Sequence, residues 1–415
     1  MEWGNLMVKK SYKMRIYPNN EQISMIDNNF IAAHRGWNYL LGFCKDIYGT
    51  IVVHGSSILV KQDLSKFSLG KIYTQLKKNT QSGYDTPIIP PSDSRIKSSI
   101  STSLSNSFKR FFQGTGGYPK FKSKKNIKYT YTTDYSSGSK KIIDKIKGNK
   151  IFIPKLKYVK FKNSYKVLIG DITSLTITKE GRKYLLSINC KNVPVNDLLK
   201  TGKEIGIDPN SKKLSFNNGV EKDNPKPDLT LQKRKKFLNK SLSRKNSKSR
   251  AFKKVKYTLQ KFYRKIKHVR EDYNNKLSTD IIKEYDIVAF EDTQNANVNK
   301  FLSGHWNDNG YYNLRKKLSY KAEWYGKEYH EVDPYNTTQR CSKCGHIGKI
   351  KVKIGKTYII KDKVDKTVKM WVCPKCNSKH HRDINAAQNI LDKALNRWTV
   401  GNSSLNLNSK RSLLA

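Results

Sequence analysis

Two pairs of cysteines near the C-terminal end constrain this chain more tightly than any other feature of its sequence. Cys341-Ser-Lys-Cys344 and Cys373-Pro-Lys-Cys376 share one spacing, and Gly345 allows a tight turn after the first pair. Four thiolates at this spacing form a closed tetrahedral site for Zn²⁺ that leaves no position open for water. The pairs therefore predict one structural zinc ion rather than disulfides or two unrelated pairs of buried cysteines. They also indicate an intracellular, reducing compartment.

The residues around the cysteines add two expectations. The segment between the pairs, residues 345–372, is longer than the commonest spacing, so we expect an inserted hairpin at Thr357–Trp371. His380 and His381 follow the second pair. Because four cysteines already complete the zinc site, we expect both histidines at the surface or near a phosphate rather than as ligands.

The net charge is the second constraint. The 415 residues include 82 Lys plus Arg against 33 Asp plus Glu, a formal charge of +49. So much like charge repels itself unless a polyanion neutralises it, which disfavours a free-standing metabolic enzyme. No stretch reaches about 18 consecutive apolar residues, and Met1–Tyr17 lacks the apolar core of a signal peptide. The charge therefore favours a nucleic-acid partner and no membrane.

The first half of the chain indicates a β module interrupted by helices. At about 150 residues per domain, the length predicts two to three domains. Lys9–Tyr17 alternates as a strand does, whereas Asn20–Ile47 and Ser94–Phe112 have helical spacing, with a short helical piece near Ile72–Lys78 between them. Tyr118–Asn192 alternates in short runs typical of a small antiparallel barrel. The helices therefore separate a first strand from the rest.

The second half reads as apolar strands and helices around a very basic stretch. The expected elements are a strand at Glu204–Asp208 with a hairpin partner at Leu214–Asn217, a basic helical region at Leu229–Leu277, a strand at Tyr285–Phe290, and helices at Tyr311–Gly326 and Arg382–Leu395. The polar tail Thr399–Ala415 is predicted to be disordered.

Three acidic residues occupy ends of these elements. Asp208 and Glu291 each end an apolar strand, and Asp383 opens the last helix. An acid at the edge of an apolar strand is costly unless its charge is offset. Carboxylates from separate elements could converge on hard divalent cations, and a pair of Mg²⁺ ions can hydrolyse a phosphodiester. The alternative is that they are helix caps or surface residues.

Short motifs with a characteristic composition lie along most of the chain. They are Lys13-Met-Arg15-Ile-Tyr17-Pro18, Arg35-Gly-Trp-Asn38, Phe108-Lys-Arg-Phe111-Phe112, Gly117-Tyr-Pro119-Lys120-Phe121-Lys122, Tyr320-Lys321-Ala322, Thr338-Gln339-Arg-Cys341 and Arg382-Asp383-Ile-Asn385-Ala386-Ala387. In this order, they resemble the motifs of TnpB, the transposon-associated RNA-guided nuclease, and of its eukaryotic and viral relatives called Fanzor. The resemblance runs from about Lys9 to Leu391 and connects the chain to type V CRISPR effectors.

The resemblance implies a multidomain α+β fold. An N-terminal wedge β-barrel with a helical recognition insert would precede an RNase H-like (RuvC) α/β nuclease domain with an inserted four-cysteine zinc ribbon. The implied segments are 1–18 (first strand of the wedge barrel), 19–113 (recognition insert), 114–199 (rest of the barrel), 200–340 (nuclease domain with the first two acids), 341–376 (zinc ribbon), 377–398 (closing helix with the third acid) and 399–415 (disordered tail).

The resemblance also implies the chemistry and the partners. Asp208, Glu291 and Asp383 match the three RuvC acids, which hold two catalytic Mg²⁺ ions; we choose Glu291 over its neighbour Asp292 because strand alternation puts it at the strand end. The partners would be a guide RNA from the transposon end and double-stranded target DNA beside a short flanking motif. The particle would be a monomeric or weakly self-associating ribonucleoprotein, in the nucleoid or cytoplasm of a prokaryote or the nucleus of a eukaryotic or viral host.

Candidate nucleic-acid contacts are basic residues within or near these motifs. They are Lys13, Arg15, Arg35, Arg95, Lys120, Lys122, Lys124, Lys125, Thr132, Arg244, Arg250 and Arg382. Lys233–Lys267 is a candidate face for RNA or heteroduplex, although a solvated helix face has the same composition. Ser94, Arg95, Ser98 and Tyr129–Thr133 correspond by position to residues that read the flanking motif, but their side chains differ, so the motif is not predicted.

Three other functions fit parts of the sequence. A non-cleaving RNA-guided DNA-binding repressor would need a lost acid, and all three are present. An RNase H-like transposase would need another carboxylate order and no cysteine insertion between the second and third acids. In an RNA-binding zinc protein, the acids would be merely structural.

Overall fold

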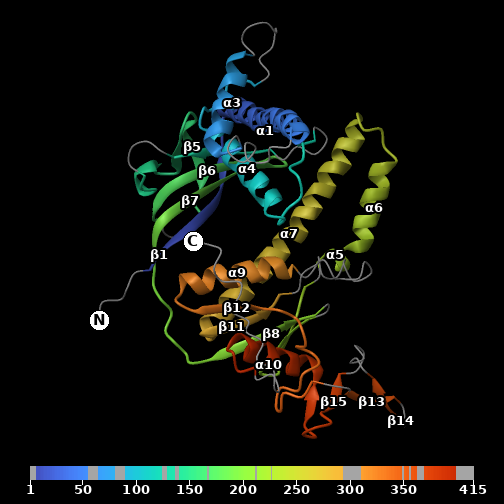
Figure 1. Cartoon of the computed structure of the whole chain (residues 1–415). Coiled ribbons are helices and arrows are strands. Elements are labelled where there is room, and N and C mark those ends of the chain that lie inside the picture. The colour runs from blue at the N-terminus through green and yellow to red at the C-terminus, as the bar shows by residue number, and fades with distance from the viewer. Residues whose placement is uncertain are drawn as a thin grey trace. The chain divides into compact units, whose positions relative to one another are not determined.

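The computed structural model describes residues 6–54, 64–79, 89–123, 129–135, 140–165, 168–210, 213–225, 227–292, 310–347, 350–354, 357–361 and 369–398. The chain divides into two compact units, Met7–Val195 and Asn196–Ala415, the latter joined by Met1–Leu6. Figure 1 shows the chain, with helices and strands of both units labelled where there is room. In the described part of the chain, no helix combines the length and apolar character that crossing a membrane requires.

The first unit is built on a curled, seven-stranded sheet (Figure 1). Its strands are β1 (Leu6–Tyr17), β2 (Thr130–Asp134), β3 (Ile146–Lys147), β4 (Lys150–Ile153), β5 (Lys157–Lys162), β6 (Asp171–Glu180) and β7 (Lys183–Val195), in the order β2-β6-β7-β1-β5-β4-β3. The first strand in sequence therefore lies in the middle of the sheet, between β7 and β5. Alternate residues of β7 are buried, as expected for a strand with one face on a core.

In the described part of the chain between β1 and the later strands lie the helices α1 (Asn20–His54), α3 (Lys66–Asn79) and α4 (Ile96–Phe112). Asn19 starts α1 through reciprocal bonds, because its side chain accepts from Gln22 N at 2.8 Å and its backbone N–H donates to the Gln22 side chain at 3.1 Å. Ile96, Ile100 and Leu104 are buried at four-residue spacing along α4. Such a stripe is what holds an amphipathic helix on a core.

The second unit contains a five-stranded mixed sheet in the order β10-β9-β8-β11-β12. Its strands are β8 (Glu204–Pro209), β9 (Lys213–Phe216), β10 (Glu221–Asp223), β11 (Ile287–Glu291) and β12 (Glu328–Val332). β8, β11 and β12 run parallel, whereas β9 and β10 continue from β8 as antiparallel neighbours. Sequence periodicity did not predict β10 and β12, because three or five largely exposed residues carry little apolar signal.

Helices cover both faces of this sheet (Figure 1). The apolar side chains of β8, β9 and β11 pack against α7 (Arg250–Glu284) and α9 (Tyr311–Trp324) on one face. On the other face, Ala289 and Val332 contact Ile390 and Leu391 of α10 (Arg382–Ala394). The strand ends of β8 and β11 are thereby fixed between two apolar layers.

The basic region predicted as one helical stretch is two helices after a short α5 (Pro227–Thr230). α6 (Gln232–Ser243) ends before α7, and the Ser249 side chain begins α7 by accepting from Phe252 N at 3.0 Å. Leu238 is the buried residue of α6, and the buried residues of α7 concentrate in its second half. The basic side chains of α6 and of the first half of α7 therefore lie mostly outside the hydrophobic core.

The segment between the cysteine pairs differs from the prediction. A hairpin forms from β13 (Ile350–Ile354) and β14 (Thr357–Lys361), whereas β15 (Met370–Val372) pairs with β16 (Lys379–His381). The predicted hairpin at Thr357–Trp371 was wrong, because two alternating runs separated by Gly355-Lys356 make a shorter hairpin. The predicted disordered tail, 399–415, lies outside the described residues.

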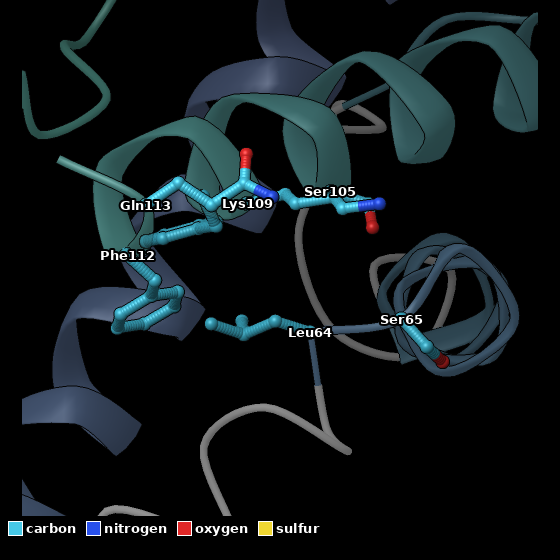
Figure 2. Close-up of a pocket in the computed structure, with 7 residues that line it drawn as sticks. Leu64, Ser65, Ser105, Lys109, Phe112 and Gln113 are labelled. Carbon is cyan, nitrogen blue, oxygen red and sulfur yellow. The ribbon is translucent and has the colours of Figure 1, made fainter. Parts of the chain in front are cut away.

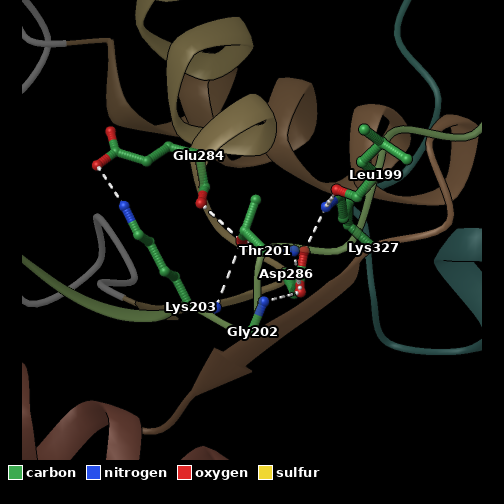
Figure 3. Close-up of polar contacts among 7 residues, drawn as sticks. All are labelled: Leu199, Thr201, Gly202, Lys203, Glu284, Asp286 and Lys327. Atoms are coloured by element: carbon green, nitrogen blue, oxygen red, sulfur yellow. Dashed lines mark hydrogen bonds and ion pairs between the residues drawn. The ribbon is translucent and has the colours of Figure 1, made fainter.

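The carboxylate of Asp286, just before β11, binds residues that precede β8 and β12 (Figure 3). Asp286 accepts from the backbone N–H groups of Thr201 at 2.8 Å and Gly202 at 2.7 Å, and it pairs with the fully buried side chain of Lys327. Burial opposes ionisation here, but the Lys327 charge and the two amides prevail and lower the pKa of Asp286. The approaches to β8, β11 and β12 are thus tied together at the end of the sheet opposite Asp208.

Candidate metal sites

Asp208 and Glu291 are neighbours at one edge of the sheet. The parallel register pairs Ile207 with Phe290, so the next residues along, Asp208 and Glu291, emerge side by side. They are only 6% and 7% exposed. Because successive residues of a strand alternate between its faces, both point away from the face of Ile207 and Phe290, toward α10.

The third acid, Asp383, reaches the same face because α10 lies unusually close to β8. A Cβ added at Gly206 would stand 2.0 Å from the carbonyl oxygen of Ala387, so only glycine fits there. Gly206 shares a strand face with Asp208, two residues on, and Ala387 shares a helix face with Asp383, four residues back. One strand–helix contact therefore sets where Asp383, which is 3% exposed, meets the sheet.

The three acids interact electrostatically. Burial, followed by the negative charges of Glu291 and Asp383, raises the pKa of Asp208 well above its ordinary value, while Arg382 opposes the shift. Arg382 donates to Oδ1 of Asp383 from Nε at 2.9 Å and from Nη2 at 2.8 Å. The sequence predicted Arg382 as a nucleic-acid contact, and the structure pairs it with the third acid.

Glu291 is held by a residue that sequence reasoning did not assign to the site. Thr337 Oγ1 donates to Glu291 Oε2 at 2.9 Å. Burial raises the pKa of Glu291 to about 7, although the Thr337 bond and the charge of Lys393 act in the other direction. Asp292, the rejected alternative, pairs with Arg315 instead, and its side chain is 33% exposed.

The carboxylates of Asp208, Glu291 and Asp383 are suited to hard cations, but their oxygen atoms do not form one tight cluster. Within the described residues, the groups of three or more potential ligands whose atoms lie within 4.8 Å of one another are the four cysteines and the set Glu221, His381 and Asp383. Buried, mutually repelling carboxylate oxygens are the donors that Mg²⁺ prefers. Asp208, Glu291 and Asp383 together do not form such a set among the described residues.

The four cysteines predicted as ligands do converge. The sulfur atoms of Cys341 and Cys376 are 3.7 Å apart, and those of Cys344 and Cys373 are 3.6 Å apart. Zinc–sulfur bonds of about 2.3 Å in a tetrahedron place neighbouring sulfurs about 3.8 Å apart. The cluster can therefore hold a metal ion such as zinc.

The two cysteine pairs have the same backbone geometry. Gly345 donates to the carbonyl of Cys341 and Asn377 donates to the carbonyl of Cys373, both at 2.9 Å. Gly345 and Asn377 both have positive φ, 73° and 54°. Each pair is thus followed by a left-handed residue that turns the chain around the sulfurs.

His380 corrects one prediction. Its side chain is buried rather than at the surface, with Nε2 3.1 Å from Cys341 Sγ and 2.7 Å from Ser378 Oγ. The short strand β16 alternates, so His380 points inward and its ring lies 4.7 Å from that of Trp371. His380 therefore contacts the sulfur of Cys341 but is absent from the tight ligand cluster formed by the cysteines.

Two asparagines of α10 connect the cysteine cluster to the acids. Asn385 donates to Arg340 O at 2.8 Å and accepts from Ser342 N at 2.9 Å. Asn389 donates to Thr337 O at 2.8 Å and to Arg340 O at 2.6 Å. Because Thr337 also binds Glu291, the segment entering Cys341 is joined to two of the acid-bearing elements. Asn385 lay within a sequence motif, but only the contacts reveal the part played by Asn389.

The predicted nucleic-acid residues are scattered over both units. The structure places Lys13 and Arg15 on β1, Arg35 on α1, Arg95 before α4, Lys120 and Lys122 after α4, and Thr132 on β2. Arg244 directly follows α6, and Arg250 is the first residue of α7. Lys122 is bound to α1, since its Nζ lies 4.5 Å from the ring centroid of Trp37. Lys124 and Lys125 lie outside the described residues.

A hollow in the first unit offers no comparable chemistry. It has a volume of about 340 Å³ and lies between α4 and the residues before α3 (Figure 2). Leu64 and Phe112 project into it, and Lys109 is its charged residue. Its lining residues include neither paired acids nor soft ligands.

Three family models match parts of the chain. They are "Helix-turn-helix domain" of the OrfB IS605 type over residues 7–50, "Probable transposase" of the same type over 187–301, and "Cas12f1-like, TNB domain" over 311–390. In this structure, the first of these segments is a strand followed by one long helix.

Curated relatives point to the same family. The chain is 26% identical to "Putative RNA-guided DNA endonuclease InsQ" of Escherichia coli over 59% of its own length and 64% of that protein. It is 24% identical to "Putative RNA-guided DNA endonuclease" of Streptomyces pristinaespiralis, over 94% and 90%. A "TnpB-like protein L770" of Acanthamoeba polyphaga mimivirus is 26% identical over 68% and 47%. The chain is thus similar, over most of its length, to proteins named RNA-guided DNA endonucleases and TnpB-like proteins.

The chain also resembles a solved structure along most of its length. It superposes on a chain of the Cas12f1–sgRNA–target DNA complex with a TM-score of 0.53 at 14% identity, covering 92% of this chain and 98% of that one. At this identity the likeness establishes a shared multidomain α+β fold.

Proposed function

We propose that this TnpB-like chain is an RNA-guided DNA endonuclease that hydrolyses phosphodiester bonds of target DNA. Asp208, Glu291 and Asp383 would hold its catalytic divalent cations. The observation that carries the proposal is that three scarce acids, distant in the sequence of a chain with charge +49, lie buried on one face of one sheet.

The chain's own residues would prepare this site. Gly206 lets α10 bring Asp383 to the sheet, and Thr337 fixes one oxygen of Glu291. Burial and the charges of Glu291 and Asp383 raise the pKa of Asp208, and a bound cation would offset that repulsion. When bound, two divalent cations supply water activation and charge neutralisation at the leaving oxygen. The cysteine cluster, bonded to α10 through Asn385, would keep the third acid in place.

The proposed RNA and DNA partners are inferred from the positive charge of the chain and from its relatives. Relatives are named RNA-guided DNA endonucleases, and the similar solved chain is bound to sgRNA and target DNA. A guide RNA from the transposon end would pair with one DNA strand, while the protein reads a short flanking motif. The exposed basic side chains of α6 and early α7, within Lys233–Lys267, are suited to phosphate contacts.

The test is to express the chain together with the DNA that flanks its gene, purify it, and sequence the RNA that copurifies. A plasmid carrying the matching target beside a randomised flank is then incubated with the particle, with Mg²⁺ or with a chelator. We expect Mg²⁺-dependent cleavage by the wild type, and target binding without cleavage by Asp208→Ala. A discrete RNA with wild-type binding but no cleavage would indicate a repressor. Absence of a discrete RNA would overturn the proposal.

A further inference from the structure

A row of three side chains crosses the sheet from the buried acids to solvent. The antiparallel registers pair Asp208 with Ser215 and Ser215 with Glu221. Residues directly opposite one another on antiparallel strands point to the same face. Asp208, Ser215 and Glu221 therefore line up on the face that α10 covers, in order across β8, β9 and β10.

Two residues at the start of α10 meet the outer end of this row. One ligand atom from each of Glu221, His381 and Asp383 lies within 4.8 Å of the other two. Glu221 is exposed, His381 is half-buried and Asp383 is buried. The group thus contains two carboxylates and one imidazole, and it is open to solvent on the Glu221 side.

Two buried polar atoms, one in this row and one in this group, have no hydrogen-bond partner among the residues that the structure describes. Ser215 is 0% exposed, and its Oγ makes no hydrogen bond among the described residues; the same is true of the buried Nδ1 of His381. An unsatisfied buried hydroxyl costs about 1–3 kcal/mol. Ser215 lies directly across from Glu221 in the sheet register, and His381 is itself a member of the group, so both unsatisfied atoms belong to this part of the fold.

Two cations of the protein already neutralise part of the charge. Lys213 pairs with Glu221, and Arg382 pairs with Asp383. Neither side chain can bridge both carboxylates and the imidazole at once. A divalent cation can, because two carboxylates balance its charge and imidazole nitrogen is a good ligand for first-row transition metals.

We propose that Glu221, His381 and Asp383 form a binding site for a divalent transition-metal cation of the Mn²⁺ class, with the Ser215 hydroxyl lining it. The site shares Asp383 with the proposed nuclease centre but does not rest on cleavage. Its nitrogen ligand makes it selective for Mn²⁺ over Mg²⁺, which binds imidazole poorly.

The experiment uses the full chain without nucleic acid, its cysteine cluster loaded with zinc, and Mn²⁺ alone as the probe. Electron paramagnetic resonance counts bound Mn²⁺, and pulsed measurements detect coupling to ¹⁴N of a coordinated imidazole. We expect ¹⁴N coupling in the wild type, its loss in His381→Asn, and its persistence in the control His330→Ala. Glu221→Gln should weaken Mn²⁺ binding by about tenfold or more, whereas Glu204→Gln, at a half-buried partner of Arg397, should not.

A further variant tests the metal site even if a variant of one of its ligands folds poorly. Lys213→Gln removes the competing ion pair and leaves all three ligands, so it should tighten Mn²⁺ binding. A wild type without ¹⁴N coupling, or unchanged binding in both Glu221→Gln and Lys213→Gln, overturns the proposal. Since no step requires DNA cleavage, a chain that binds Mn²⁺ in this way but does not cut DNA would refute only the nuclease function.

Discussion

Gly206 of β8 packs against the backbone of Ala387 in α10, leaving no room for a side chain. A Cβ there would also lie 3.0 Å from the carbonyl carbon of Ala387 and 3.0 Å from Cβ of Leu391. These neighbours are backbone atoms of Ala387 and the Cβ of Leu391, which no side-chain rotation can move aside. Any residue larger than glycine must therefore move α10, and Asp383 moves with it.

Gly206→Ala should consequently damage activity more than folding. Overpacking of this kind costs about 1–3 kcal/mol of unfolding free energy, which a chain of this size can survive. Cleavage, measured at a temperature where the variant is folded, should fall by at least about 100-fold, since a misplacement of about 1 Å has that effect. Gly42→Ala is the control, because nothing lies within 4 Å of a Cβ there. Wild-type cleavage by Gly206→Ala would show that α10 is not positioned by this contact.

One pair of variants tests whether Glu291 or Asp292 is the second acid of the proposed site. Glu291 is buried beside Asp208, whereas Asp292 turns to Arg315. Glu291→Gln keeps the size and the Thr337 hydrogen bond but removes the charge, so it should abolish cleavage while target binding stays normal. Asp292→Asn should retain most cleavage and lose only the modest stability of a partly exposed ion pair. The reverse pattern would assign the second acid to Asp292.

The strand-end acids were accessible to sequence reasoning because each follows a short apolar run whose length favours a buried strand. The cysteine ligands were accessible because their spacing is duplicated. Glu221 and His381 were not, because they meet Asp383 only through the register of β10 and the approach of α10, neither of which leaves a periodic signal. Thr337 and Asn389 were missed for the same reason: they act through single hydrogen bonds between segments distant in sequence.

Stability of the metal-free protein should fall as pH rises between 4.5 and about 7. Glu291 has an ordinary pKa of 4.5, and burial raises it to about 7 in the folded chain. In this window the folded state keeps a proton that the unfolded state has lost, so the unfolding free energy decreases with pH, by up to about 3 kcal/mol. Thermal unfolding in chelator at several pH values measures the slope. Glu291→Gln should flatten it, and an equal slope in both proteins would contradict the shift.

Removing one ligand from the cysteine cluster should loosen α10 as well as the cluster. Cys373→Ser leaves three thiolates, and loss of a structural metal costs about 3 kcal/mol or more. Because Asn385 and Asn389 bond to the segment that enters Cys341, hydrogen exchange should accelerate across Arg382–Ala394 as well as near the cysteines. Lys375→Ala, an exposed residue of the same turn, should keep both metal content and exchange rates. A zinc-free Cys373→Ser protein with wild-type protection in α10 would mean that the cluster and the acids are mechanically independent.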